Sequence, residues 1–231
     1  MGLQIILKVE AVTLDDFYTL RYPIAEREGI IYPILKELKR QGLNVDDAEF
    51  LKQYFKEDKL YRKRLEETLC ESLLDDIVVK ALVACGYKPK TVSGIVKESV
   101  DYGLATRKAK WFPEAKKTLL TLQKKGYKLG LISNTHWRIS ENLRNELRKY
   151  LDVITLSYEH GYAKPHPSIF LVTLKKLGTN ANYSLHVGDD SIADIQGAKS
   201  IGMKTAFINK REIKTNADIE TKQLARLIAF L

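Results

Sequence analysis

The chain has 231 residues, of which 45% are hydrophobic and 29% charged, and its formal net charge is +9. This composition excludes a disordered chain, and no apolar run reaches the roughly 18 residues that a membrane-spanning helix needs. Basic residues occur as scattered pairs rather than as one stripe. We therefore expect a small anionic substrate, with neither nucleic acid nor a membrane as partner, and the sequence leaves the oligomeric state open.

The N-terminal residues 1–14 are apolar but carry Lys8 and Glu10 in their middle. They lack the basic start and the small-residue cleavage site of a secretory signal peptide. A β-branched apolar run over residues 4–14 ends abruptly at Asp15, as a buried strand does. We expect a cytoplasmic protein whose fold begins with this strand.

Residues 23–105 have the 3.6-residue spacing of helices and contain no convincing strand. A first helix is predicted to end at Gly42, and Asp46 is a residue type that begins helices. The same spacing continues over 59–85 and 90–104. This part of the chain is predicted to be all helical.

From Trp111 onward, helices and strands alternate. The strands are predicted at 127–132, 153–156, 184–187 and 205–208, and the helices at 113–125, 138–150, 167–177 and 191–201. The alternation predicts an α/β fold whose core is a Rossmann-like, doubly wound parallel sheet, with the all-helical block inserted into it. We expect a catalytic core at 1–20 and 110–231 and a helical cap domain at 21–109.

Polar motifs follow the predicted strands at their carboxyl ends, where such sheets carry their active sites. They are Asp15-Asp16-Phe17-Tyr18-Thr19-Leu20, Ser133-Asn134, Lys164-Pro165-His166-Pro167, and Gly188-Asp189-Asp190 with Asp194. Carboxylates gathered at one edge stay ionised only beside a cation, and Asp15 and Asp189 are oxygen ligands of the kind that Mg²⁺ prefers. Asp190 or Asp194 would join them. Lys164, before a rigid turn, would hold a phosphate as a fixed positive charge.

Two further roles follow from side-chain chemistry. Asp15 is the candidate nucleophile for an aspartyl intermediate, and the hydroxyl of Ser133 can donate to phosphate oxygens. The alternative role for Asp189 is to cap the helix that follows it.

The four motifs occur in the order of the haloacid dehalogenase-like hydrolase superfamily, which the sequence resembles closely over 9–20 and 111–211. The resemblance is to the subgroup with a helical cap between the first and second motifs, and it implies Mg²⁺-dependent hydrolysis. The implied catalytic residues are Asp15, Ser133 and Lys164, and the implied substrate-binding residues are Ser133, Asn134 and Lys164. The implied metal ligands are Asp15, the backbone carbonyl of Phe17, and Asp189, supported by Asp190 and Asp194.

Phe17 departs from the family's phosphatases, which usually have a second aspartate here as general acid and base. Its loss predicts a slow or selective phosphatase, because such assistance contributes ~10²–10⁴ in rate. An aromatic residue here resembles the family's 2-haloacid dehalogenases, but those usually replace the acidic fourth motif, which this chain keeps at Asp189. Tyr18 also stands where glycine is usual.

The sequence therefore predicts a phosphatase for a small phosphomonoester. The alternatives are a metal-independent 2-haloacid dehalogenase and a non-catalytic descendant that binds a phosphorylated ligand. Outside the motifs, we expect His186 to be a buried core residue and Arg21 to lie on the solvated surface.

Overall fold

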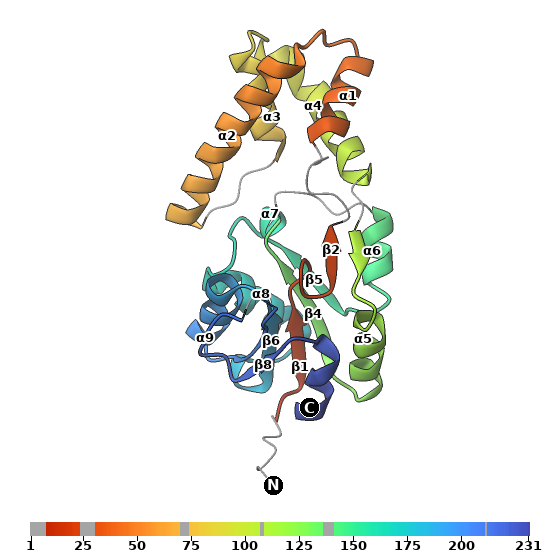
Figure 1. Cartoon of the computed structure of the whole chain (residues 1–231), viewed down its shortest axis with the longest axis vertical. Helices are drawn as coiled ribbons and strands as arrows, with labels where there is room; N and C mark the ends of the chain where they lie inside the picture. The colour runs from red at the N-terminus through yellow and green to blue at the C-terminus, as the bar shows by residue number, and fades with distance from the viewer. Residues whose placement is uncertain (1–7, 24–30, 70–73, 107–108, 136–140, 211) are drawn as a thin grey trace.

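The computed structural model describes residues 8–23, 31–69, 74–106, 109–135, 141–210 and 212–231. A helical part lies above an α/β part in Figure 1, and the two are joined near β2. Within the described residues, no helix is both long and apolar enough to cross a membrane. The cytoplasmic location stays a prediction.

The α/β part is built on a parallel sheet, with six strands among the described residues in the order β5-β4-β1-β6-β7-β8. The strands are β1 (Ala11–Leu14), β4 (Lys128–Ser133), β5 (Val153–Leu156), β6 (Ser184–Gly188), β7 (Lys204–Ile208) and β8 (Ile219–Thr221). β1 lies between β4 and β6, so the residues after these three strands meet at one edge. The predicted doubly wound α/β core is confirmed; β8 was not predicted.

Helices cover both faces of the sheet (Figure 1). α5 (Ala115–Lys124) and η3 (Leu224–Phe230) share one apolar core with the strands, and α8 (Pro167–Leu177) and α9 (Gly197–Ser200) share another. α6 (Glu141–Leu147) lies beside α5 in the view of Figure 1. The residues of the four central strands β1, β4, β6 and β7 are almost all buried, as in a sheet covered on both sides.

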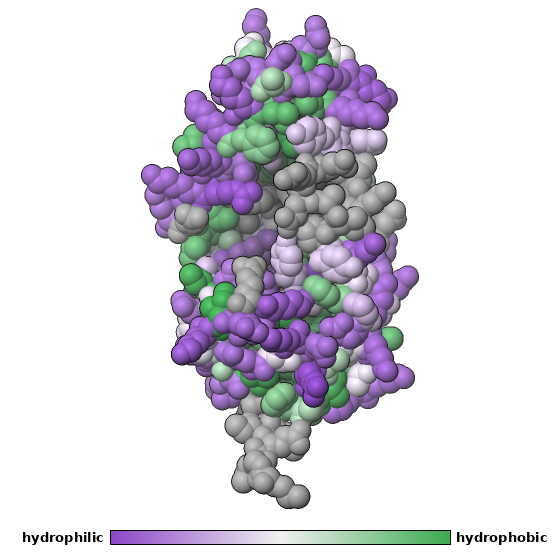
Figure 2. Space-filling view, viewed as in Figure 1, coloured by the Kyte–Doolittle hydropathy of each residue, from purple (hydrophilic) through white to green (hydrophobic). Residues whose placement is uncertain are grey.

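The inserted cap is helical in its described residues, as predicted. It comprises α1 (Ile31–Arg40), α2 (Asp47–Thr68), α3 (Leu74–Ala84) and α4 (Pro89–Thr106). These helices enclose a separate apolar core, and Figure 2 shows mostly hydrophilic side chains on the face of the cap turned to the viewer. Asp46 caps α2 by accepting a hydrogen bond from Glu49 N at 2.8 Å. The segment predicted as one helical run at 59–85 is divided between α2 and α3.

A two-stranded antiparallel ribbon joins the cap to the core. It pairs β2 (Arg21–Pro23) with β3 (Ala109–Trp111), so that Arg21 lies opposite Trp111. The sequence predicted no strand in β2, because three residues are too few to show a period. The ribbon lies where the core was expected to give way to the cap, and the boundaries at 20/21 and 109/110 stay a prediction.

The cap also contacts the core beside the third motif. The end of α2 reaches Leu69, whose carbonyl oxygen accepts a hydrogen bond from Ala163 N at 2.8 Å. Ala163 immediately precedes Lys164. One end of the cap is thus held next to the residues at the strand ends.

Candidate active site

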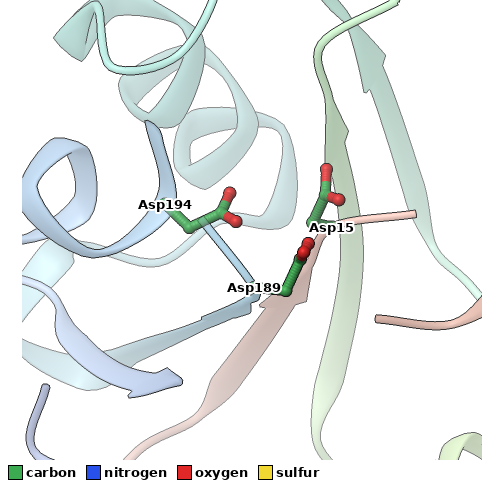
Figure 3. A group of neighbouring side chains, drawn as sticks. All are labelled: Asp15, Asp189 and Asp194. Carbon is green, nitrogen blue, oxygen red and sulfur yellow. The ribbon is translucent and has the colours of Figure 1, made fainter. Parts of the chain in front are cut away.

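Three aspartates converge at the carboxyl ends of β1 and β6. Asp15 follows β1, Asp189 follows β6, and Asp194 lies in η2 (Ser191–Gln196); Figure 3 shows their side chains directed toward one another. One carboxylate oxygen of each lies within 4.8 Å of the others. The structure therefore brings together the acidic residues that the sequence predicted at this edge.

Lys164 lies between two of these carboxylates. Its Nζ donates to Oδ1 of Asp15 and to Oδ1 of Asp194, both at 2.6 Å, and the residue is only 4% exposed. A buried ammonium group needs such partners, because an unpaired charge is costly to bury. Lys164 is thus placed to meet an anion bound at Asp15.

The charges in this cluster do not balance. Burial, reinforced by the negative charge of Asp194, raises the pKa of Asp15 to about 8, although Lys164 opposes the shift. Burial alone would raise the pKa of Asp194 as well, but Lys164 and the hydrogen bond with His186 hold it below its usual value. Asp15 and Asp194 likewise hold the pKa of Lys164 above its usual value, against the effect of burial.

A divalent cation fits this arrangement. One lysine cannot compensate both Asp15 and Asp194, so a second positive charge would keep Asp15 ionised at neutral pH. Carboxylate oxygens are the donors that Mg²⁺ prefers over sulfur or nitrogen. Mg²⁺ and the backbone carbonyl of Phe17 as its ligand stay predictions.

Asp194 is held in place by three hydrogen-bond donors. In addition to Lys164, His186 Nε2 lies 3.1 Å from its Oδ1, and Asp190 N donates to its Oδ2 at 3.0 Å. His186 is completely buried, and burial lowers the pKa of its imidazole. The neutral ring can donate to Asp194 through Nε2 while Nδ1 accepts from the hydroxyl of Thr13 at 2.8 Å. The prediction of a satisfied core histidine is confirmed.

Gly188 and Asp190 help to place η2, the helical element that carries Asp194. A Cβ atom at Gly188 would lie 2.1 Å from Asp194 Cγ, so only glycine lets this carboxylate lie over the strand end. Asp190, rather than Asp189, caps η2 (Ser191–Gln196) by accepting from Ile192 N and Ala193 N at 2.8 Å. Asp189 is therefore not used as the helix cap.

Ser133 ends β4 and Asn134 follows it, on the other side of β1 from Asp189. Ser133 is 3% exposed at the end of the strand. Both polar atoms of the Asn134 amide bind the main chain of Lys164: Nδ2 donates to its carbonyl oxygen at 2.8 Å, and Oδ1 accepts from its N–H at 2.7 Å. In this arrangement Asn134 orients Lys164, and its predicted contact with substrate is not tested.

The loop after Asp15 adopts a conformation that normally favours glycine. Tyr18 has φ = 62°, and its N–H donates to the carbonyl oxygen of Arg21 at 2.6 Å. Leu20 N and Arg21 N both donate to the carbonyl oxygen of Asp16. Tyr18 therefore holds a left-handed conformation that glycine adopts freely, at a cost of roughly 1–2 kcal/mol.

The prediction for Arg21 is wrong. It is 2% exposed and forms an ion pair with Asp16, which is equally buried. The sequence signal that could have indicated this is the pattern around it: Leu20 precedes it and Tyr22 follows, which is compatible with a short strand under the cap. Trp111, which pairs with Arg21 in the ribbon, is 90 residues away along the chain, so the sequence alone does not reveal that Arg21 is buried.

A doubly wound core, an inserted helical cap and an aspartate beside a buried lysine at the strand ends define a class of capped α/β hydrolases. The chain belongs to the haloacid dehalogenase-like hydrolases, whose family model matches residues 24–208.

Curated relatives carry phosphatase names. The glyceraldehyde 3-phosphate phosphatase of Methanocaldococcus jannaschii is 30% identical over 204 residues, 85% of this chain and 81% of that protein. The enzyme of that name from Pyrococcus furiosus is 37% identical over 128 residues, and the phosphoglycolate phosphatase of Aquifex aeolicus is 36% identical over 117. These two matches span about half of each relative, 53% and 54%.

Solved structures share the fold over nearly the whole chain. A 2-haloacid dehalogenase from Pseudomonas syringae pv. Tomato DC3000 is 24% identical with a TM-score of 0.75, covering 96% of this chain and 97% of that one. A HAD phosphatase from Thermococcus onnurineus is also 24% identical, with a TM-score of 0.63 and coverage of 95% and 96%. At this level of identity the likeness concerns the fold alone.

Proposed function

We propose that this protein is a Mg²⁺-dependent phosphatase that hydrolyses a small phosphomonoester through an aspartyl-phosphate on Asp15. The observation that carries the proposal is the convergence of Asp15, Asp189 and Asp194, with the buried Lys164 bonded to Asp15 and Asp194. Displacement of a halide does not need three carboxylates. Phosphoryl transfer needs positive charge around the transferred group, and three carboxylates can bind the cation that supplies it.

The names of the relatives support the same substrate class. The matched proteins from Methanocaldococcus and Aquifex are named for glyceraldehyde 3-phosphate and phosphoglycolate. The net charge of +9 gives a field that favours anionic substrates. We extend the class, a small phosphomonoester, to this chain and leave the particular ester to experiment.

The residues of the chain have separate tasks in this reaction. An oxygen of Asp15 forms a bond to phosphorus while the bond from phosphorus to the leaving oxygen breaks. The ammonium of Lys164 stabilises the charge on the transferred group, and the hydroxyl of Ser133 donates to one of its oxygens. Water then attacks the aspartyl-phosphate, which releases inorganic phosphate and restores Asp15.

The metal site would be formed by Asp15, Asp189 and the backbone carbonyl of Phe17. Asp190 and Asp194 would support it, Asp194 by fixing Lys164. When bound, Mg²⁺ supplies positive charge that keeps Asp15 ionised and offsets charge on the transferred phosphoryl group.

Phe17 favours a second candidate, a metal-independent 2-haloacid dehalogenase. A halide leaves without a proton, so an aromatic residue at this position is compatible with that chemistry, whereas an alkoxide leaving group benefits from a proton donor. A third candidate, a non-catalytic protein that binds a phosphorylated ligand, is also compatible with Phe17.

One screen separates the three. The protein is incubated with p-nitrophenyl phosphate, glyceraldehyde 3-phosphate, phosphoglycolate and 2-chloropropionate, each with Mg²⁺ and with a chelator. Phosphate release that requires Mg²⁺ supports the proposal. Chloride release in chelator establishes the dehalogenase, and ligand binding without turnover of any compound establishes the non-catalytic protein.

A further inference from the structure

Arg21 is a buried arginine that lies five residues after Asp16, the neighbour of the candidate nucleophile Asp15. Its side chain and that of Asp16 are each 2% exposed. Arginine is seldom buried to this degree unless it is paired. A guanidinium group at this depth, so close in sequence to the candidate nucleophile, calls for a role.

The ion pair is bidentate, because two nitrogens of Arg21 bind the two carboxylate oxygens of Asp16. Arg21 Nε donates to Asp16 Oδ1 at 2.6 Å, and Nη2 donates to Asp16 Oδ2. Two parallel hydrogen bonds fix the orientation of a carboxylate, whereas a single bond leaves it free to rotate. The direction of the Asp16 side chain is thereby set.

Two aromatic rings enclose the same guanidinium. Arg21 Cζ lies 5.6 Å from the centroid of the Phe17 ring and 5.8 Å from that of Trp111. Both distances are within the range of cation–π attraction. Arg21 therefore contacts the side chains of the two residues that follow Asp15, and the β3 strand opposite its own.

The main chain of Arg21 is tied to the same loop. Its N–H donates to Asp16 O at 3.0 Å, and its carbonyl oxygen accepts from Tyr18 N at 2.6 Å. Arg21 also belongs to β2, where it pairs with Trp111. One residue thus joins the loop after Asp15 to the ribbon that leads into the cap.

We propose that Arg21 is a positioning residue, which fixes the loop that presents Asp15 by acting through Asp16 and Phe17. The inference rests on the proposed function for its link to turnover. The positive charge of Arg21 also compensates the negative charge of Asp16, which would otherwise add to the negative charges of Asp15 and Asp194 at the strand ends.

Stability alone does not explain such a pair. A buried ion pair is often no more stabilising than an apolar or neutral pair of similar volume, because desolvation offsets the attraction. What a neutral pair lacks is the bidentate geometry. Geometry and stability can therefore be separated by replacing both partners together.

The test compares the wild type with Asp16→Asn/Arg21→Met, with Arg21→Lys, and with Arg40→Met as control. The double variant removes both charges and so leaves no unpaired charge. Arg21→Lys keeps the positive charge but cannot form the two parallel hydrogen bonds of the guanidinium group. Arg40→Met breaks an arginine–carboxylate pair in the cap, with Glu37. For each protein, melting temperature, kcat and KM are measured, and the Mg²⁺ dissociation constant is measured by calorimetry.

We expect the double variant to melt close to the wild type while its kcat falls on the order of tenfold to a hundredfold and KM changes little, because the nucleophile is displaced. Arg21→Lys should show a smaller loss, and the control should keep its kcat. Wild-type kcat in the double variant would overturn the inference. If the double variant does not fold, Arg21→Lys is judged by the same criterion.

Failure of the proposed function is seen separately, in the wild type. If the wild type releases no phosphate but releases chloride from 2-chloropropionate, the kcat for chloride release is compared between the wild type and the double variant. The same fall in kcat is expected, because Asp15 is the nucleophile in that reaction too. If it turns over neither, the Mg²⁺ dissociation constant decides: a severalfold weakening in the double variant supports the positioning role, and an unchanged constant overturns it.

Discussion

Lys210 donates a hydrogen bond from Nζ to the carbonyl oxygen of Tyr18 at 2.9 Å, across 192 positions of the chain. The same Nζ lies 3.2 Å from the centroid of the Phe112 ring. Burial lowers the pKa of Lys210, against the opposing charges of Glu114 and Asp189. Tyr18, the left-handed residue in the loop after Asp15, is therefore held by a lysine that follows β7.

Lys210→Met should loosen this loop. We expect a loss of about 1 kcal/mol in the free energy of unfolding, the net value of one hydrogen bond, and a fewfold fall in kcat. Urea denaturation and steady-state kinetics measure the two effects. Lys214→Met, at an exposed position nearby, is the control and should change neither; equal losses in both variants would argue against a specific role for Lys210.

Asp15→Asn should abolish turnover and leave the fold intact, because a neutral amide is a poor nucleophile and a poor metal ligand. Circular dichroism and activity on p-nitrophenyl phosphate test the two halves of this prediction. Glu10→Gln, five residues upstream and exposed, should be almost silent. Substantial turnover by Asp15→Asn would mean that another residue is the nucleophile.

Mg²⁺ should raise the melting temperature and be required for phosphate release, since Lys164 alone cannot compensate the charges of Asp15 and Asp194, to which Asp189 adds a third. The shift should grow with the Mg²⁺ concentration and disappear in chelator. Asp189→Asn should reduce the shift at a given concentration. If Mg²⁺ leaves the melting temperature of both the wild type and the variant unchanged, the proposed metal site is wrong.

Gly188→Ala should inactivate the protein more than it destabilises it. The added methyl group would meet Asp194 at 2.1 Å and displace it, and with it Lys164, so we expect kcat to fall on the order of a hundredfold. Gly94→Ala is a matched control in α4, where a Cβ meets nothing within 4 Å. That variant should be active and slightly more stable, by up to about 1 kcal/mol.

The lack of a proton donor at Phe17 should make the rate depend strongly on the leaving group. Wild type should hydrolyse p-nitrophenyl phosphate, which releases a stabilised anion, far better than an alkyl phosphate. Phe17→Asp should narrow this gap by less than the ~10²–10⁴ of general acid catalysis, because the charge of Arg21 would lower the pKa of the introduced carboxyl group and keep it ionised.

Steady-state kinetics on both esters decide this, with Phe17→Asn as a control that has no acidic proton. A gain of a thousandfold or more on the alkyl phosphate in Phe17→Asp would show that Arg21 does not hold the new carboxylate. Brisk hydrolysis of the alkyl phosphate by the wild type would mean that another group supplies the proton.

The sequence predicts the site where a strand leads directly into it. Asp15 and Asp189 could be placed together because the carboxyl ends of parallel strands share one edge, whereas Lys164, which lies beyond β5 and α7, is placed beside them by the order of the motifs. The cap could be recognised as helical because long helices repeat their apolar pattern several times. In both cases the signal is local in the chain.

The contacts that orient the site could not be predicted in this way. Asn134 binds Lys164 across 30 positions, and Lys210 reaches Tyr18 across 192. Arg21 belongs to a three-residue strand, too short for a period, and its burial depends on Trp111 from the other side of the cap. Such partners become visible only when the chain is folded.

The hydrogen bond between Leu69 and Ala163 joins main-chain atoms only. Any residue other than proline can supply the N–H at position 163, and the carbonyl oxygen at position 69, where φ is 55°, likewise excludes only proline outright. Substitutions can therefore accumulate over the surface of the cap without erasing this attachment to the core. In evolutionary terms, the cap can change its substrate specificity while its attachment next to Lys164 is kept.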